Sequence, residues 1–210
     1  MSGTGRRHVS ALPAVHSDAN RVARLRPREV LDHGAEDTRD HANYDLALID
    51  VIVRQVQFAQ GRPAETYYSI GQPDYVVVLA LTLAEELLLV RQYRPAIERF
   101  SLELPAGFRE PNEAPIDTAS RELLEETGYP AVLIEPIGSA ATCSSRISNS
   151  KLSFFARTGE RSRDFVQESG VSVVAIPLDA VRDLVMWGDF SEQTHLGVLM
   201  QAVIRGLIRL

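Results

Sequence analysis

The chain has 210 residues, which is the length of one domain with an additional segment, and its 45% apolar and 24% charged residues are typical of a globular protein. The net charge of -6 gives no reason to expect nucleic-acid binding. The single cysteine, Cys143, excludes an internal disulfide and a cysteine-based zinc site, and it favours a cytoplasmic protein.

The N-terminal part of the chain differs in composition from the rest. Residues 1–43 are polar, mixed in charge and poor in periodicity, so we predict a mobile extension followed by one domain over residues 44–210. The domain begins with DLALIDVIVRQVQF, which is rich in β-branched residues, and AQGRP separates it from ETYYSI. This pattern predicts an antiparallel hairpin before the main body of the domain.

Two apolar runs follow the hairpin. YVVVLALT and ELLLVRQY predict buried strands joined at Ala84 and Glu85, and the acids Glu85 and Glu86 interrupt what would otherwise resemble a membrane span. We therefore expect no membrane partner. RFSLELPAG predicts one further short strand, ended by Pro105 and Gly107.

The second half of the chain predicts three helices and three strands. Pro115 suits the first turn of a helix, and Gly128 suits the position just beyond its end. AVLIEPIG, KLSFFA and VSVVAIPL predict strands, while DAVRDLVMW and SEQTHLGVLMQAVIRGLI predict a short and a longer helix. His195 lies inside the last helical pattern, where we expect it to be packed or at the surface. Strands outnumber singly inserted helices, so we predict an α/β (α+β) fold with a mixed sheet between helices.

One predicted helix carries an unusual group of acids. Glu122, Glu125 and Glu126 share a face, and Arg121 lies four residues before Glu125. Taken alone, RELLEE would suit a solvated surface helix, but such helices usually intersperse lysines and this one has none. Carboxylates this close raise one another's pKa or hold a cation. Oxygen ligands select hard cations, so Mg²⁺ is the expected occupant, with Mn²⁺ as an alternative.

The spacing around these acids has a known counterpart. In order, it comprises Gly107, five residues, Glu113, seven residues, Arg121-Glu122-Leu123, one residue, Glu125-Glu126, one residue and Gly128. This pattern resembles the Nudix box, and residues 44–210 resemble the Nudix hydrolases. The resemblance implies an α/β/α sandwich and hydrolysis of nucleoside diphosphates linked to another group.

The resemblance also implies roles for single residues. Arg121 would brace the glutamates, Glu113 would secure the loop, and Gly107 would let the backbone turn tightly. Arg121 and Glu126 would thus be catalytic. The implied metal ligands are the carboxylates of Glu122, Glu125 and Glu126 and, as a further candidate, the carbonyl of Ala106.

A second stretch narrows the subfamily. RQYRPAIERFSLELPAG resembles the corresponding segment of ADP-ribose pyrophosphatases and related nucleotide-sugar hydrolases. The resemblance implies Mg²⁺-dependent cleavage of ADP-ribose to a nucleoside monophosphate and a sugar phosphate by a homodimer. Arg94 would contact substrate phosphate or ribose, and Glu103 would border the metal site. The alternative for this pair is a loop arginine bonded to a strand glutamate.

The region after the box departs from that subfamily. ADP-ribose hydrolases commonly carry a proline about sixteen residues beyond the box, and SAATCSSRISNSKLSFF has none. SSRISNS resembles the substrate loop of some relatives, which implies Arg146 and Asn149 as substrate contacts. GDP-mannose and UDP-glucose therefore stay open as substrates beside ADP-ribose, as does a non-catalytic nucleotide-sugar sensor.

A general base is expected in the loop RTGERSRDFVQESG, before the strand VSVVAIPL. Glu168 aligns best with the acid that the subfamily places there. Glu160 and Asp164 compete with it.

Overall fold

The computed structural model describes residues 49–59, 62–168 and 170–210. The predicted extension over residues 1–43 lies outside this part of the chain, as do the first residues of the predicted domain. Within the described ranges, no helix is long and apolar enough to cross a membrane.

The predicted hairpin is confirmed. Strands β1 (Asp50–Val56) and β2 (Glu65–Gly71) pair antiparallel along their whole length and form a sheet of their own. The pairing sets Asp50 opposite Gly71 and Val56 opposite Glu65. β-Branched residues and tyrosines in these strands suit an extended, partly exposed backbone.

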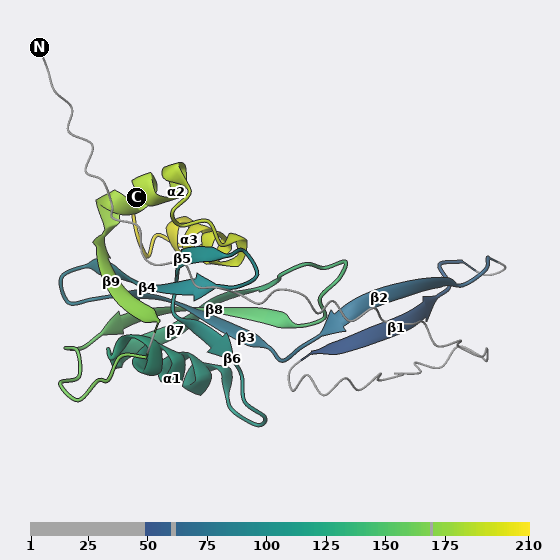
Figure 1. Cartoon of the computed structure of the whole chain (residues 1–210), viewed down its shortest axis with the longest axis horizontal. Helices are drawn as coiled ribbons and strands as arrows, with labels where there is room; N and C mark the ends of the chain where they lie inside the picture. Colours follow the sequence, from purple (N-terminus) through teal and green to yellow (C-terminus); the bar gives the residue numbers. More distant parts are fainter. Residues whose placement is uncertain (1–48, 60–61, 169) are drawn as a thin grey trace, which may run out of the picture. The chain divides into compact units, whose positions relative to one another are not determined.

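The remaining strands form one mixed sheet, as predicted (Figure 1). Its main path is β5-β4-β3-β8-β7, with β6 paired to β3 and β9 paired to β4. β3 and β8 run parallel, and the other neighbours run antiparallel. The strands are β3 (Tyr75–Leu81), β4 (Glu86–Arg94), β5 (Arg99–Glu103), β6 (Ala106–Phe108), β7 (Ala131–Ala141), β8 (Ser150–Thr158) and β9 (Val171–Pro177).

The predicted strand in RFSLELPAG ends before Pro105, as expected, but Gly107 does not end a strand, because it lies inside a second one. β5 pairs with β4, whereas β6 pairs with β3 and sets Gly107 opposite Val76. The chain changes partner at Pro105, which has no N–H to donate and whose carbonyl accepts a bond from the Val78 N–H at 2.9 Å.

Helices cover both faces of the sheet. The even-numbered side chains at the start and middle of β3 pack with α1 (Pro115–Thr127), and the odd-numbered ones pack with α2 (Leu178–Trp187) and α3 (Gln193–Ile204). β3 is almost wholly buried, which explains its continuous apolar sequence. The predicted mixed sheet between helices is therefore confirmed.

The ends of α1 lie where the sequence predicts them. Pro115 occupies the first turn, and Gly128 ends the helix with a φ of 77° and an N–H bond to the Leu124 carbonyl at 2.8 Å. A side chain at Gly128 would be strained by this φ and would also overlap the ring of Phe165. Because α1 begins and ends at these residues, the positions of its carboxylates around the helix axis are set.

Candidate active site

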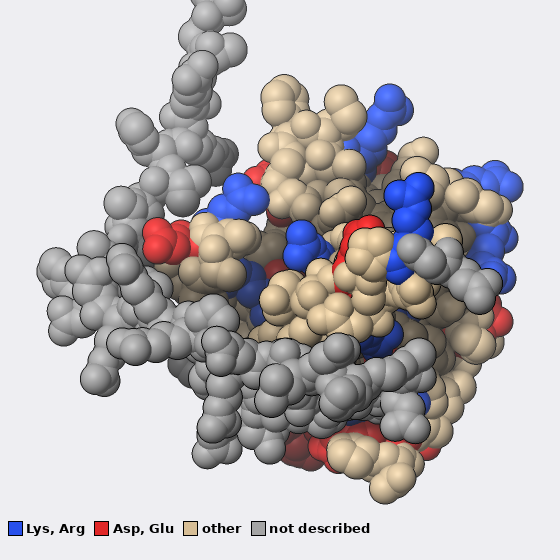
Figure 2. Space-filling model, turned by 90° about the vertical axis from the view of Figure 1, so that its right-hand side faces the viewer, with Lys and Arg blue, Asp and Glu red and all other residues tan. Residues whose placement is uncertain are grey.

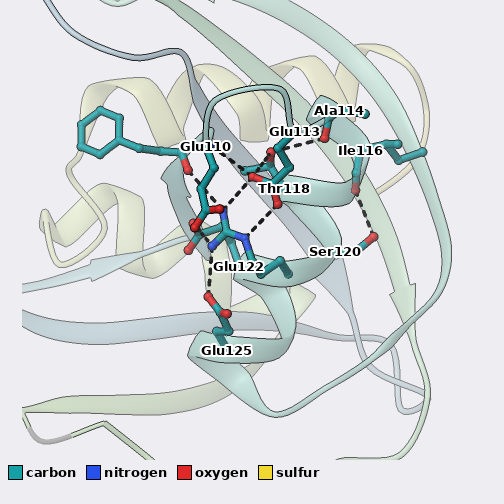
Figure 3. A network of polar contacts seen from close by, with 10 residues as sticks. Glu110, Glu113, Ala114, Ile116, Thr118, Ser120, Glu122 and Glu125 are labelled. Carbon is teal, nitrogen blue, oxygen red and sulfur yellow. Dashed lines mark hydrogen bonds and ion pairs between the residues drawn. The ribbon is translucent and has the colours of Figure 1, made fainter. Parts of the chain in front are cut away.

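The Arg121 guanidinium gathers three of the acids (Figure 3). Its Nε and Nη2 donate to the two oxygens of Glu113 at 2.9 and 3.0 Å. Its Nη1 donates to Glu122 at 2.7 Å and to Glu125 at 3.0 Å. Nη2 also donates to the Phe108 carbonyl at 3.2 Å. We call these five residues the Arg121 network, and it ties β6, the following loop and α1 into one unit.

Glu113 connects the loop to the helix. Besides its two bonds from Arg121, it accepts the Thr118 hydroxyl at 2.8 Å and the Glu110 N–H at 3.2 Å. The bonds from Arg121 are the main cause that lowers the pKa of the Glu113 carboxyl to about 2. Glu113 is therefore a fixed anion over the whole neutral range.

Gly107 has a different role from the expected one. It lies inside β6, its φ is not positive, and the expectation that it permits a tight turn is wrong. A Cβ atom at this position would overlap the carboxylate of Glu122. Glycine at this position thus leaves room for the Glu122 carboxylate, which lies directly against the backbone of β6.

Glu126 lies on α1 and contacts the same strand, β6. Its Oε2 accepts the Ala106 N–H at 2.9 Å. Because Pro105 occupies a hydrogen-bonded position opposite Val78, the alternation of an antiparallel ladder turns the N–H and carbonyl of Ala106 away from β3. The Ala106 carbonyl therefore lies on the side from which Glu126 approaches.

Burial acts on two of these acids. It is the main cause that raises the pKa of Glu126 to about 8, and it also raises the pKa of Glu122 above its ordinary value. The Glu126 carboxylate is therefore costly to ionise unless a positive charge lies close by.

The donor set suits a hard divalent cation, although its present arrangement is not that of a closed site. In the described part of the chain, no three His, Cys, Asp or Glu side chains converge as metal ligands. The reason is that Arg121 draws Glu122 and Glu125 toward itself. Three carboxylates beside one guanidinium carry excess negative charge, and oxygen donors of this kind favour Mg²⁺ or Mn²⁺. Each of Glu122 and Glu125 gives one oxygen to Arg121, which leaves its second oxygen for a cation.

Arg94 and Glu103 form a two-bond ion pair beside this site. Arg94 Nε donates to Glu103 Oε1 at 2.8 Å, and Nη2 donates to Oε2. Burial would raise the pKa of Glu103, but the bonds from Arg94 outweigh it and lower the pKa. Both residues line a cavity of about 420 Å³. A space-filling view shows basic side chains around a hollow in one face of the molecule, with acidic ones nearby (Figure 2).

The predicted substrate-loop residues make other contacts. Arg146 is exposed, and its carbonyl accepts the Ile70 N–H of β2 at 2.6 Å. Asn149 is buried and donates to the Pro73 carbonyl at 3.0 Å, while its Oδ1 has no partner among the described residues. No hydrogen bond joins either side chain to Arg94 or Arg121 in the described ranges.

The loop that holds the candidate bases is fastened to the end of α1. Arg161 donates to the Thr127 carbonyl at 3.0 Å, and the Ser162 N–H donates to the Gly128 carbonyl at 2.8 Å. Glu168 is exposed, and its carbonyl accepts the Val171 N–H at 3.2 Å. Glu160 and Asp164 are exposed as well, so burial does not separate the three candidates.

Two residues near Arg94 were not among the predicted site residues. His195 is packed, which is one of the two positions expected for it from the sequence. Its Nδ1 accepts the Leu104 N–H at 3.0 Å. Lys151 is 8% exposed, and its Nζ lies 3.4 Å from the centroid of the Tyr75 ring. Its one sequence signal is that the chain has no other lysine, although KLSFFA places it in a buried strand.

Known proteins share this sequence and fold. The NUDIX domain family matches residues 72–189, more than half of the chain. The ADP-ribose pyrophosphatase of Bacillus subtilis is 40% identical over 84 residues, which cover 40% of this chain and 45% of that protein. The ADP-sugar pyrophosphatase of Mus musculus is 46% identical over 70 residues, 29% of this chain and 32% of the relative. The chain thus matches less than half the length of each.

A solved structure has the same fold. It is described as an ADP compounds hydrolase, and it superposes with a TM-score of 0.66 over 81% of this chain and 94% of that one. The sequence identity is 21%, so this likeness concerns the fold.

Proposed function

This chain belongs to the NUDIX domain family, and we propose that it hydrolyses the diphosphate bond of ADP-ribose or a related nucleoside diphosphate sugar. The products would be a nucleoside monophosphate and a sugar phosphate. The observation that carries the proposal is the Arg121 network, with the Glu126 carboxylate buried beside it against Ala106.

A bound cation is part of this proposal. Its ligands would be Glu122, Glu125 and Glu126, with the Ala106 carbonyl as a fourth. Mg²⁺ or Mn²⁺ there would neutralise diphosphate charge and make a bound water more acidic. The chain's own contribution is to keep Glu122 against β6 and Glu126 against Ala106, so that both carboxylates stay in place.

Arg94 is the proposed contact for substrate phosphate or ribose. Two of its N–H groups are held by Glu103, which fixes the plane of the guanidinium and leaves Nη1 for a ligand. Arg146, and Asn149 through its Oδ1, are proposed as further substrate contacts. Glu168 is the proposed general base, with Glu160 and Asp164 as alternatives in the same loop.

We also propose a homodimer in the cytoplasm. Support for the dimer comes from the hairpin and a residue just beyond β1, which expose several large apolar side chains: Val51, Phe58, Tyr67, Tyr68 and Ile70. Light scattering at working concentration should give twice the chain mass, and a monomer would contradict the dimer.

The test is a substrate panel with Mg²⁺, read by mass spectrometry of the products. It should contain ADP-ribose, GDP-mannose, UDP-glucose and an oxidised nucleoside triphosphate. We expect cleavage of ADP-ribose to AMP and ribose 5-phosphate. Cleavage of only GDP-mannose or UDP-glucose would keep the proposed reaction and change the proposed substrate to another nucleoside diphosphate sugar. Glu126→Gln should abolish turnover, whereas Glu135→Gln, on an exposed part of β7, should not. Tight ADP-ribose binding without any product would favour a sensor and overturn the proposal.

A further inference from the structure

The cavity beside Arg94 contains a lysine that forms no ion pair with any described residue, although the charge of Glu192 acts on it from a distance. Lys151 lines this cavity and is more than nine-tenths buried. Its Nζ faces the Tyr75 ring, and no hydrogen bond or ion pair of Nζ to another described residue is present. Burying an ammonium group is costly unless an anion balances it, and a ring face balances it only in part. Burial accordingly lowers the pKa of Lys151 to about 8.

The start of α3 lines the same cavity. The Glu192 carboxylate caps this helix by accepting the His195 N–H at 2.9 Å. Gln193 and Thr194 occupy the first turn, and their N–H groups have no hydrogen bond to another described residue. The first turn of a helix favours anions, because its N–H groups are free and carry partial positive charge. Two independent features thus point to an anion.

The charged residues that line the cavity sum to one positive charge, with Arg94, Arg99 and Lys151 against Glu103 and Glu192. Arg94 is paired with Glu103, and Glu192 is engaged at the start of α3. Arg99 and Lys151 are the remaining cations, and Arg99 has a long bond of 3.5 Å to the Ser191 hydroxyl. An ammonium, a guanidinium and free N–H groups together are the donor set for a phosphate group.

The cavity is larger than a phosphate ion and lies close to the carboxylates of α1. Its volume of about 420 Å³ would accept a phosphate together with a sugar. The charge of Glu126 contributes, after burial, to a raised pKa of Tyr75, which lines the cavity. The cavity is therefore near enough to Glu126 for one substrate to reach both.

We propose that this cavity, which we call the Lys151 pocket, is a phosphate subsite for the sugar-phosphate end of the substrate and for the sugar phosphate released. Lys151, Arg99 and the first turn of α3 would hold the phosphate oxygens. The identity of the ligand rests on the proposed function, whereas binding of phosphate by Lys151 does not.

Calorimetry on the full chain without added metal tests the subsite. The probes are ribose 5-phosphate, AMP and inorganic phosphate, which distinguish the sugar-phosphate end from the nucleotide end. In Lys151→Gln the Kd for ribose 5-phosphate should rise by at least about 10-fold, as expected for the loss of a charge-assisted hydrogen bond. The control Arg157→Gln removes a cation from the same strand, where it pairs with Glu85 away from the pocket, and should leave the Kd unchanged. Equal affinity in the wild type and Lys151→Gln would overturn the proposal, and so would tighter binding of AMP.

A second measurement needs no variant. Because Lys151 is the only lysine, its acetylation can be followed by mass spectrometry, with the N-terminal amine as internal reference. Saturating ribose 5-phosphate should slow acetylation of Lys151 by at least about fivefold, since occupancy removes the free amine. An unchanged rate would contradict the subsite.

The two proposals fail separately. If a nucleotide sugar is cleaved but phosphate binds equally well to the wild type and Lys151→Gln, the proposed hydrolase function stands and the proposed subsite is wrong. Phosphate binding that depends on Lys151, with no cleavage of any nucleotide sugar, would keep the subsite and remove the hydrolase.

Discussion

Arg121 and Lys151 are cations in opposite surroundings. Arg121 is about one-quarter exposed and donates to three carboxylates and a carbonyl. Lys151 is more deeply buried, and its Nζ lies over the Tyr75 ring without a hydrogen bond or ion pair to another described residue. The hydrogen bonds that Arg121 donates to Glu113 are the main cause that raises the pKa of Arg121, whereas burial lowers that of Lys151.

This difference separates a cation that holds structure from one that is available to a ligand. The bonds of Arg121 are satisfied within the protein, so its removal should be felt as lost stability and lost geometry. The charge of Lys151 is unsatisfied, so its removal should cost no stability, and the loss should be felt as weaker binding when an anion is present. Four variants test this contrast.

The largest effect is expected for Arg121→Gln. The change frees Glu113, Glu122 and Glu125 at once and leaves partly buried carboxylates without their cation. We expect a loss of about 2–3 kcal/mol in the free energy of unfolding, less than for a fully buried pair, measured by urea denaturation. Turnover should fall at least about 100-fold, because the carboxylates lose their fixed positions. Arg157→Gln, which breaks the half-exposed pair with Glu85, should cost below about 1 kcal/mol. Equal losses of unfolding free energy in the two variants would contradict the structural role of Arg121.

Gly107→Ala disturbs the same network from the side of β6. The added methyl group meets the end of the Glu122 side chain, which is flexible enough to move away from Arg121. We expect a cost of about 1 kcal/mol in stability and about 10-fold in turnover. Gly197→Ala is the control, because a Cβ there meets nothing within 4 Å and alanine favours a helix. A Gly107→Ala protein with full stability and turnover would show that contact with Glu122 is not needed.

Glu113→Gln tests the network through pH. The pKa of Glu113 is lowered from 4.5 to about 2 in the folded chain. The unfolded chain therefore binds a proton more readily, and the bonds of Glu113 stabilise fully above pH 4.5 and are lost toward pH 2. The wild type should exceed Glu113→Gln by about 1 kcal/mol at pH 6, a value reduced for solvent screening, with the gap closing as the pH falls. The same change in an Arg121→Gln background should show little pH dependence.

Sequence reasoning succeeded where the interactions are local in the chain. The limits of α1 follow from Pro115 and Gly128, and the meeting of Arg121 with Glu125 follows from helical spacing. The hairpin and the mixed sheet could also be predicted, since both depend on short alternating or apolar runs. Contacts between residues close in sequence need no knowledge of strand order.

The features that the sequence could not supply depend on long-range register. β6 exists because the chain changes partner at Pro105, and no local pattern announces that exchange. The parallel pairing of β3 with β8 sets Tyr75 opposite Lys151, and α3 then closes the pocket from far along the chain. The room that Gly107 leaves for a side chain likewise becomes visible only when Glu122 lies against it. A motif can assign residues to a site without giving the physical reason for each.

The smallest effect, and the one that most sharpens the contrast, is expected for Lys151→Met. Burial lowers the pKa of Lys151 from 10.5 to about 8, so the unfolded chain binds more protons between these values and wild-type stability rises with pH there. Methionine removes the charge, and we expect a gain of about 1 kcal/mol below pH 8 that shrinks toward pH 10.5. Other titratable groups around the pocket are common to both proteins: Tyr75, Arg94, Arg99, Glu103, Glu192 and His195. Ribose 5-phosphate should raise the Tm of the wild type and leave that of Lys151→Met almost unchanged. A destabilised Lys151→Met protein would mean that the ammonium group holds structure, as Arg121 does, and the contrast would fail.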